Sequence, residues 1–333
     1  MRIPGVKTAR NVSRWVRARV LGGGLILGYH RVTNAMSDTY EICVSPEHFT
    51  EHMELVSKYA HPISLSTLVQ HLKEGSLPSN AVAITFDDGY VDNLHQAKPI
   101  LEKYQIPATV FVCTGYLGKE FWWDELETLV MLSKADLGSL HLQVGEKLFV
   151  SNQPKVSPEA DTIESRRQFR HALYHFILAL DVESQHDAMN MIRSWSGTSS
   201  DKATTSRAMN DKELIQLADG GLIELGSHTR HHPMLPQLSF DEQKAEIVSG
   251  KDDLDEILGR TTEGFSYPNG RATPSAKQIV QEAGLTYACT SLHDVIRNGS
   301  DEYELTRFWQ KDVDGESFMR GLSLWMNMRR NHA

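Results

Sequence analysis

Cysteine is scarce in this chain of 333 residues, and the three that occur lie far apart in the sequence. Cys43, Cys113 and Cys289 form no Cys-x-x-Cys pair. This spacing suggests neither a disulfide framework nor a zinc site built from thiolates. We therefore expect three reduced, buried thiols in a reducing compartment.

The chain also lacks any apolar run of about 18 residues, the length that would suggest a transmembrane helix. Positive charge is not in excess either, because 34 Lys and Arg residues against 43 Asp and Glu give a net charge of -9. Nucleic-acid binding requires a basic surface, so this composition argues against a nucleic-acid partner. A neutral, sugar-like substrate fits it better.

Positive charge does gather at the beginning of the chain, in residues 1–23. These residues include six Lys and Arg, and the first acidic residue of the chain is Asp38. A signal peptide also begins with positive charge, but the apolar run here, residues 20–29, contains four glycines and continues into His30 and Arg31. We therefore interpret residues 24–30 as a strand and expect a cytoplasmic protein. The basic segment is expected to be a solvated helix or tail, and contact with the inner face of an anionic membrane is the alternative.

From residue 24 onward, apolar segments alternate with amphipathic ones. Strands that are buried on both faces of a parallel sheet give continuous apolar runs of this kind. The pattern predicts an α/β fold, which a single domain of this length can accommodate. Strands are expected at 24–30, 81–86, 108–113, 222–225 and 286–290, with the segment GFSYP at 264–268, and helices at 46–59, 66–74, 93–104 and 275–283.

The alternation is interrupted between about residues 118 and 209, which we interpret as a largely helical insertion into a domain that spans residues 24–333. Phe121-Trp122-Trp123-Asp124 begins one helix, and another is expected at roughly 164–180. The size of both indoles favours a place in the core, and stacking of Trp123 on a sugar is the alternative. If the insertion covers the mouth of the domain, it would select the substrate, and Asp124 could reach the pocket.

Two adjacent carboxylates, Asp87 and Asp88, follow the buried strand 81–86 and precede Gly89. Barrel enzymes place their catalytic groups at the carboxyl ends of such strands. Carboxylates this close repel each other, and the repulsion is relieved if one binds a cation and the other serves as a base. An ordinary turn is the alternative, which the buried strand before the pair makes less attractive.

Three histidines lie within five residues in Gly226-Ser-His-Thr-Arg-His-His-Pro233, again after an apolar strand. Imidazoles four residues apart can converge on one ion where the backbone turns, and imidazole together with carboxylate suits zinc and other first-row divalent metals. His228 and His232 are therefore candidate ligands beside Asp88. His231 is an alternative to His232, although Pro233 fixes the turn in favour of His232.

Three segments resemble, in this order, the motifs of the polysaccharide deacetylase family, the NodB-homology carbohydrate esterases: Thr85-Phe-Asp-Asp-Gly-Tyr90, Ser227-His-Thr-Arg-His-His-Pro233 and Phe265-Ser-Tyr-Pro-Asn-Gly270. The segment Tyr29-His-Arg-Val32 is similar to the start of many members. The resemblance covers about residues 24–115 and 210–310. It implies a distorted (β/α) barrel of about seven strands.

The resemblance also implies a role for each motif residue. Asp87 would be the base that activates water, and a divalent metal would bind to Asp88, His228 and His232. Zn²⁺ is the expected ion, with Co²⁺, Ni²⁺ or Mn²⁺ as alternatives, because such ions acidify water and polarise an acetyl carbonyl. A backbone N–H near Tyr267 would bind the oxyanion. The substrate groove would be lined by Tyr267, Pro268 and Asn269.

Two features of the family pattern are missing. Many members have an arginine just before the groove proline, which orients the base, whereas this chain has Phe265. Many also have a late leucine-x-histidine motif that supplies the acid, which His293 does not clearly match. We group Arg307 with the groove residues as the candidate orienting charge, with a surface salt bridge as the alternative. His30 is the candidate acid, with a hydrogen-bonded strand-end histidine as the alternative.

Together these features favour removal of an N-acetyl group from an acetamido sugar. The missing export signal favours a nucleotide-linked or lipid-linked precursor, or an oligosaccharide, in bacterial surface-polysaccharide biosynthesis. A deformylase or another amidase is one alternative. A metal-binding protein that recognises carbohydrate without catalysis is another, but a pure binding site needs no second carboxylate such as Asp87.

Overall fold

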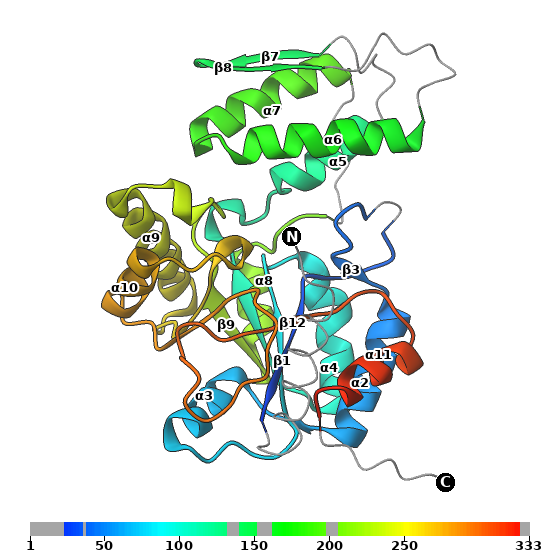
Figure 1. Cartoon of the computed structure of the whole chain (residues 1–333), viewed down its shortest axis with the longest axis vertical. Helices are drawn as coiled ribbons and strands as arrows, with labels where there is room; N and C mark the ends of the chain where they lie inside the picture. Colours follow the sequence, from blue (N-terminus) through cyan, green and yellow to red (C-terminus); the bar gives the residue numbers. More distant parts are fainter. Residues whose placement is uncertain (1–22, 36–37, 132–139, 152–161, 198–205, 327–333) are drawn as a thin grey trace, which may run out of the picture.

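A curled parallel sheet forms the centre of the computed structural model, which describes residues 23–35, 38–131, 140–151, 162–197 and 206–326 (Figure 1). Seven strands follow the order β11-β10-β9-β6-β5-β1-β12, and each neighbouring pair is parallel. The predicted distorted barrel of about seven strands is confirmed as a curled half-barrel. The strands are β1 (Leu25–Tyr29), β5 (Ala81–Phe86), β6 (Ala108–Val112), β9 (Ile223–Ser227), β10 (Gly264–Ser266), β11 (Tyr287–Cys289) and β12 (Phe308–Trp309).

The two ends of this sheet approach each other through the segment that leads into β12. Leu305 forms a parallel bridge with Cys289 of β11, and its N–H donates to the carbonyl of Ala288 at 2.9 Å. Arg307 lies between this bridge and β12, at the seam of the half-barrel. Three short strands lie outside the main order: β4 (His61–Pro62), beside the start of β5, and the paired strands β2 (Arg31–Val32) and β3 (Cys43–Val44).

Helices cover the outside of the sheet, and the expected helices are present. In Figure 1, α9 and α10 flank it on one side, and α2, α4 and α11 on the other. Residues 93–97 depart from the expectation, because they form a π-helical turn (η1) before α4. The helices are α2 (Pro46–Tyr59), α3 (Leu65–Glu74), α4 (Lys98–Tyr104), α8 (Asp211–Ala218), α9 (Phe240–Leu258), α10 (Pro274–Glu282) and α11 (Gly315–Ser323).

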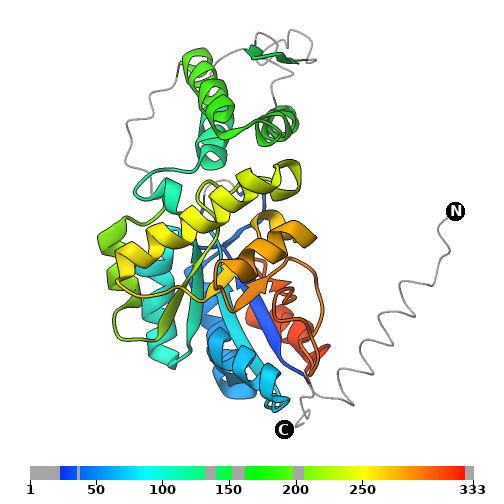
Figure 2. The same ribbon diagram turned by 90° about the vertical axis from the view of Figure 1, so that its left-hand side faces the viewer.

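A smaller helical unit sits over one end of the half-barrel (Figure 2). It comprises α5 (Trp122–Met131), the hairpin of β7 (His141–Val144) and β8 (Lys147–Val150), α6 (Ile163–Leu178) and α7 (Val182–Ser196). Its apolar core, which includes Leu126, Leu173 and Ile192, is continuous with buried Tyr90 and Cys113 of the barrel. The unit is therefore packed onto the barrel rather than tethered to it.

None of the described helices is both long and apolar enough to cross a bilayer. Residues 1–22 of the predicted basic segment lie outside the described part of the chain. The expected cytoplasmic location and membrane contact therefore stay predictions.

Strand register brings the motif residues to one edge of the sheet. Tyr29 pairs with Phe86, and Phe86 with Val110, while Ser227 pairs with both Val112 and Phe265. The residues that follow these strand ends therefore meet at the carboxyl edge, beneath the helical unit. They include His30, Asp87 and His228.

Candidate active site

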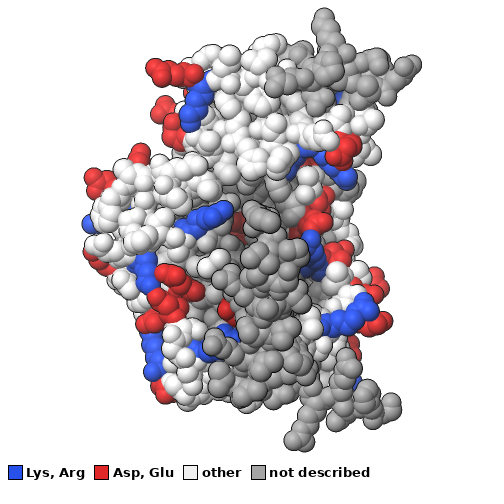
Figure 3. All heavy atoms as spheres, in the orientation of Figure 1, with Lys and Arg blue, Asp and Glu red and all other residues white. Residues whose placement is uncertain are grey.

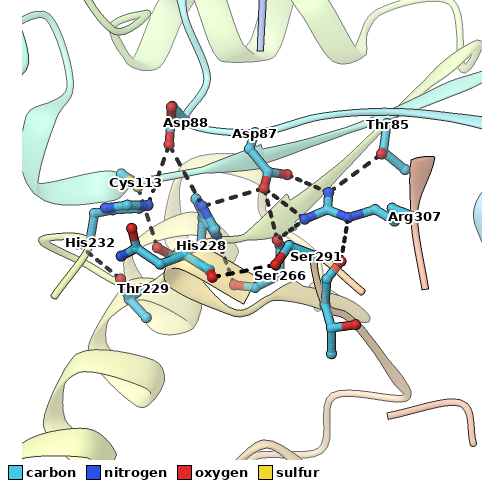
Figure 4. A network of polar contacts seen from close by, with 12 residues as sticks. Thr85, Asp87, Asp88, Cys113, His228, Thr229, His232, Ser266, Ser291 and Arg307 are labelled. Carbon is cyan, nitrogen blue, oxygen red and sulfur yellow. Dashed lines mark hydrogen bonds and ion pairs between the residues drawn. The ribbon is translucent and has the colours of Figure 1, made fainter. Parts of the chain in front are cut away.

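The two adjacent aspartates diverge because the chain turns sharply between them. Asp88 adopts a left-handed backbone conformation with φ at 72°, and Gly89 follows with φ at 83°. A side chain in this region costs about 1–3 kcal/mol, a strain that concentrates at functional sites. Figure 4 shows the result: the Asp88 carboxylate faces His228 and His232, while the Asp87 carboxylate lies between Arg307 and His228.

The histidines reach Asp88 from the loop after β9. The Nδ1 atom of His228 lies 2.7 Å from the Ser266 carbonyl, so Nε2 is turned toward the carboxylates and lies 3.6 Å from Asp88 Oδ1. His232 Nε2 lies 3.8 Å from the same oxygen. Thr229 and His232 both have left-handed backbones, and the N–H of His232 donates to Thr229 Oγ1 at 3.0 Å. These local turns bring two side chains from one loop to one point.

The three residues fit a divalent metal ion. One ligand atom from each of Asp88, His228 and His232 lies within 4.8 Å of the others, and Asp88 Oδ1 is buried without a hydrogen-bond partner. Carboxylate and imidazole donors suit zinc and related first-row ions. His231, the alternative ligand, points elsewhere, because its Nδ1 lies 2.7 Å from Glu246 Oε1.

Electrostatics favour the same conclusion. Burial raises the pKa of Asp88, and the neighbouring charge of Asp87 raises it further. Burial also lowers the pKa values of His228 and His232, which favours the neutral imidazoles that metals bind. A cation among the three would restore the ionised state of Asp88 without competing with protons on the imidazoles.

Asp87 has the opposite surroundings. Arg307 is fully buried and donates to both carboxylate oxygens, from Nη1 to Oδ1 at 2.7 Å and from Nη2 to Oδ2 at 2.8 Å. Burial acts to raise the pKa of Asp87, but the charges of Arg307 and His228, together with the hydrogen bonds from Arg307, outweigh it and hold that pKa well below its usual range. The surface alternative for Arg307 is therefore wrong, and its predicted place among groove residues is corrected, since it lies behind Asp87 instead of lining the cavity.

The guanidinium of Arg307 is itself held on every side. Its Nε donates to the Thr290 carbonyl at 3.0 Å, and Nη2 donates to Ser266 Oγ at 2.9 Å. The Trp309 ring lies 4.4 Å from its central carbon, and the same ring stacks on the imidazole of His30 at 4.5 Å. Arg307 thus holds the Asp87 carboxylate in one orientation, and residues at the seam of the half-barrel hold Arg307 in place.

A cavity of ≈ 440 Å³ opens onto these groups between the strand ends and the helical unit. His30, Asn269 and Trp123 are among the residues that line it, and their roles in the site stay predictions. Trp123 also satisfies the core interpretation, because it is 7% exposed. Asp124 does not line the cavity, since its carboxylate accepts a 2.7 Å hydrogen bond from the Tyr90 hydroxyl.

Tyr267 and Pro268 do not line the cavity, which corrects the prediction for both. The Tyr267 side chain is fully buried among apolar residues that include Ile247 of α9 and Ile279 of α10. Its N–H donates to the Cys289 carbonyl at 3.0 Å, so it is not directed at an oxyanion. Side chains alternate along a strand, so Phe265 and Tyr267 point outward while Ser266 points inward.

Sequence reasoning missed several residues of the site. The Ser266 carbonyl accepts a hydrogen bond from His228 Nδ1, and the Ser266 hydroxyl donates to Asp87 Oδ2 at 3.1 Å. The alternation around Phe265 could have placed it inward. Trp309, Tyr40 and Tyr174 also line the cavity, but they come from distant segments that no local pattern connects.

The sequence matches a known protein family and several known proteins. The model of the polysaccharide deacetylase family matches residues 74–137 and 180–288, which include Asp87, Asp88, His228 and His232. The poly-β-1,6-N-acetyl-D-glucosamine N-deacetylase of Staphylococcus aureus (strain MSSA476) is 35% identical over 130 residues. That match covers 35% of this chain and 43% of the relative, so it spans less than half of the relative's length.

Solved structures resemble the fold over most of the chain. The deacetylase PplD from Streptococcus pyogenes, in complex with acetate, gives a TM-score of 0.58 at 19% identity, covering 91% of this chain and 99% of its own. IcaB from Ammonifex degensii gives a TM-score of 0.58 at 18% identity, with coverage of 91% and 97%. At these identities the likeness concerns the fold, and it agrees with the curled half-barrel.

Proposed function

Because the chain belongs to the polysaccharide deacetylase family, we propose that it removes the N-acetyl group of an acetamido sugar by metal-dependent hydrolysis. The central observation is that two adjacent buried aspartates have opposite surroundings. Asp88 lies beside two imidazoles, and Asp87 is ion-paired with Arg307. Opposite surroundings of this kind divide a pair of carboxylates into two chemical roles.

Each residue of the site has a task in this reaction. Asp88, His228 and His232 hold the metal, which when bound acidifies water and polarises the acetyl carbonyl. Asp87 takes the proton from the attacking water, and its ion pair with Arg307 keeps the carboxylate ionised and aimed. The cavity opens onto these groups, so an acetamide bound there would lie between them.

We assign the departing amine's proton to His30. Its imidazole lines the cavity and is held in place by stacking on Trp309. Burial lowers the pKa of His30 to about 4, while the negative charge of Asp87 acts to raise it. The imidazole is therefore neutral at rest, and the proton that it gives to the amine is the one that Asp87 takes from the attacking water. His293 lines the same cavity but is exposed, so it is less well positioned.

The cavity favours an uncharged oligosaccharide over a phosphate-linked precursor. Among the described residues that line it, Lys311 is the sole Lys or Arg, and it is ion-paired with Glu41. Among the described residues that Figure 3 colours, Lys and Arg are scattered between Asp and Glu instead of gathering in one patch. Phosphate recognition relies on such cations. An oligomer of N-acetylglucosamine, the sugar in the name of the S. aureus relative, fits better.

Acetate release from a panel of substrates tests the proposal. The panel contains free acetamido sugars, UDP-linked sugars, chitin oligomers and β-1,6-linked N-acetylglucosamine oligomers, each with the zinc-loaded protein. Acetate from the oligomers is the expected result. Formate from N-formyl analogues, with no acetate from any sugar, would instead identify a deformylase. Binding of oligomers without any release would identify a carbohydrate-binding protein.

Metal removal gives a prediction that separates the candidate histidines. Chelation should abolish acetate release, and Zn²⁺ or Co²⁺ should restore it. Zinc at 100 times its Kd should stabilise the native chain by about 2.7 kcal/mol, measured from its thermal unfolding. His232→Ala should lose this stabilisation, because it removes a ligand, whereas His231→Ala should keep it. Equal zinc content in the two variants, measured by atomic emission, would contradict the ligand set.

A further inference from the structure

Beyond the reaction centre, the cavity has a second aromatic wall that the proposed reaction does not use. Tyr40 comes from the loop before β3, and Tyr174 comes from α6 of the helical unit. Both are half-buried and line the cavity, and their ring centroids lie 4.8 Å apart. We call Tyr40 and Tyr174 the tyrosine pair.

We propose that the tyrosine pair is a subsite for the sugar ring next to the one that is deacetylated, so the helical unit sets a preference for oligomers. This inference rests on the proposed function and extends it to the length of the substrate. Aromatic rings bind the apolar faces of sugars without any need for charge, which matches a cavity whose single lysine is already paired.

A row of aromatic contacts separates the tyrosine pair from the metal ligands. Trp123 lies 5.1 Å from His232, Trp122 lies 5.5 Å from Trp123, and Tyr174 stacks on Trp122 at 5.1 Å with an interplanar angle of 29°. A ring on Tyr174 is thus three aromatic contacts from His232. Tyr174 is linked to His232 only through the rings of Trp122 and Trp123, so we place the deacetylated sugar at Asp87 and a neighbouring ring at the tyrosine pair.

The tyrosine pair is also fixed in place before any ligand arrives. The buried guanidinium of Arg170 lies 3.7 Å from the Tyr40 ring centre and 5.8 Å from that of Tyr174. Arg170 Nε lies 2.5 Å from a carboxylate oxygen of Glu127, whose other oxygen accepts from Thr39 at 2.7 Å. Rings held in this way lose little freedom on binding, which is the advantage of a preorganised site. A buried arginine with no catalytic task is explained by this clamp.

Oligosaccharide binding tests the subsite separately from catalysis. The probes are N-acetylglucosamine and its β-1,4- and β-1,6-linked tetramers, titrated by calorimetry into zinc-loaded Asp87→Asn, which is expected to bind without turnover. At least one tetramer should bind about tenfold more tightly than the monosaccharide, a preference worth one aromatic contact. Adding Tyr174→Ala should remove that preference, and adding Tyr174→Phe should keep it. Tyr59→Ala, a matched loss of an exposed tyrosine on α2, should leave it unchanged.

Two outcomes would overturn the subsite: tetramers that bind no more tightly than the monosaccharide, or a tenfold preference that survives Tyr174→Ala. Thermal unfolding of each variant, together with the Phe replacement, distinguishes a lost contact from a misfolded helical unit. Failure of the proposed function has a different signature. In that case the native chain releases no acetate from any sugar, whatever the tetramer affinities are.

Discussion

Asp87→Asn is expected to reduce the kcat for acetate release by about 10³-fold, within the range for loss of a general base. Asparagine keeps the size of the side chain and one acceptor oxygen, but it cannot take a proton from water. Asp88, His228 and His232 are untouched, so zinc content should equal that of the native chain. The measurement is steady-state acetate release from zinc-loaded protein, beside metal analysis of the same samples.

Asp252→Asn is the matched control, because it makes the same chemical change on an exposed position of α9. It should keep native activity within about twofold, as surface substitutions away from the site usually have small effects. Native-like activity of Asp87→Asn would reject Asp87 as the base. Loss of zinc in that variant would place Asp87 among the ligands instead.

The sequence predicted the candidate site best where functional residues follow a buried strand directly. Asp87 and Asp88 immediately follow a strand whose six residues are all buried, so their place at the carboxyl edge could be predicted from apolar pattern alone. His228 and His232 follow β9 in the same way. Short-range geometry therefore sufficed to predict that Asp88, His228 and His232 lie together, because the few residues before each of them fix its position.

The position of Arg307 could not be predicted from local sequence in this way. It lies 220 residues from Asp87, and their contact depends on Leu305 bridging to β11 at the seam of the sheet. A single arginine in the sequence does not indicate that the two ends of the sheet will meet there. Tyr267 was misplaced for a related reason, since the motif gave its position in the chain but the strand alternation decided its direction. Ser266, one residue earlier, faces Asp87.

The helical unit was predicted in outline only. Its α6 was expected, whereas the β7–β8 hairpin and α7 were not. Burial of Arg170 was also unforeseen, because lysine and arginine rarely enter a core without partners. Its partners Tyr40 and Glu127 come from two other segments, and only the packed structure brings them together. Specificity elements of this kind depend on long-range packing and are the hardest to find from sequence.

Arg307→Met is expected to lower the free energy of unfolding by about 3–5 kcal/mol, the usual cost of removing one partner from a buried ion pair. Methionine fills much of the volume but leaves the Asp87 carboxylate buried without its counter-charge. The Thr290 carbonyl and the Ser266 hydroxyl lose a donor as well. Activity should fall too, because the base is no longer aimed. Chemical denaturation and acetate release measure the two effects.

Arg307→Lys is the control that keeps the positive charge but loses the paired hydrogen bonds. Lysine cannot donate in parallel to both oxygens of Asp87 as Arg307 does. It should recover part of the stability but less of the activity. A double-mutant cycle with Asp87→Asn then isolates the pair: because the two side chains contact each other directly, their losses should be less than additive by about 1–3 kcal/mol. Additive losses would show that Arg307 stabilises the seam of the half-barrel without acting on Asp87, and the aim of the base would have to come from Ser266 alone.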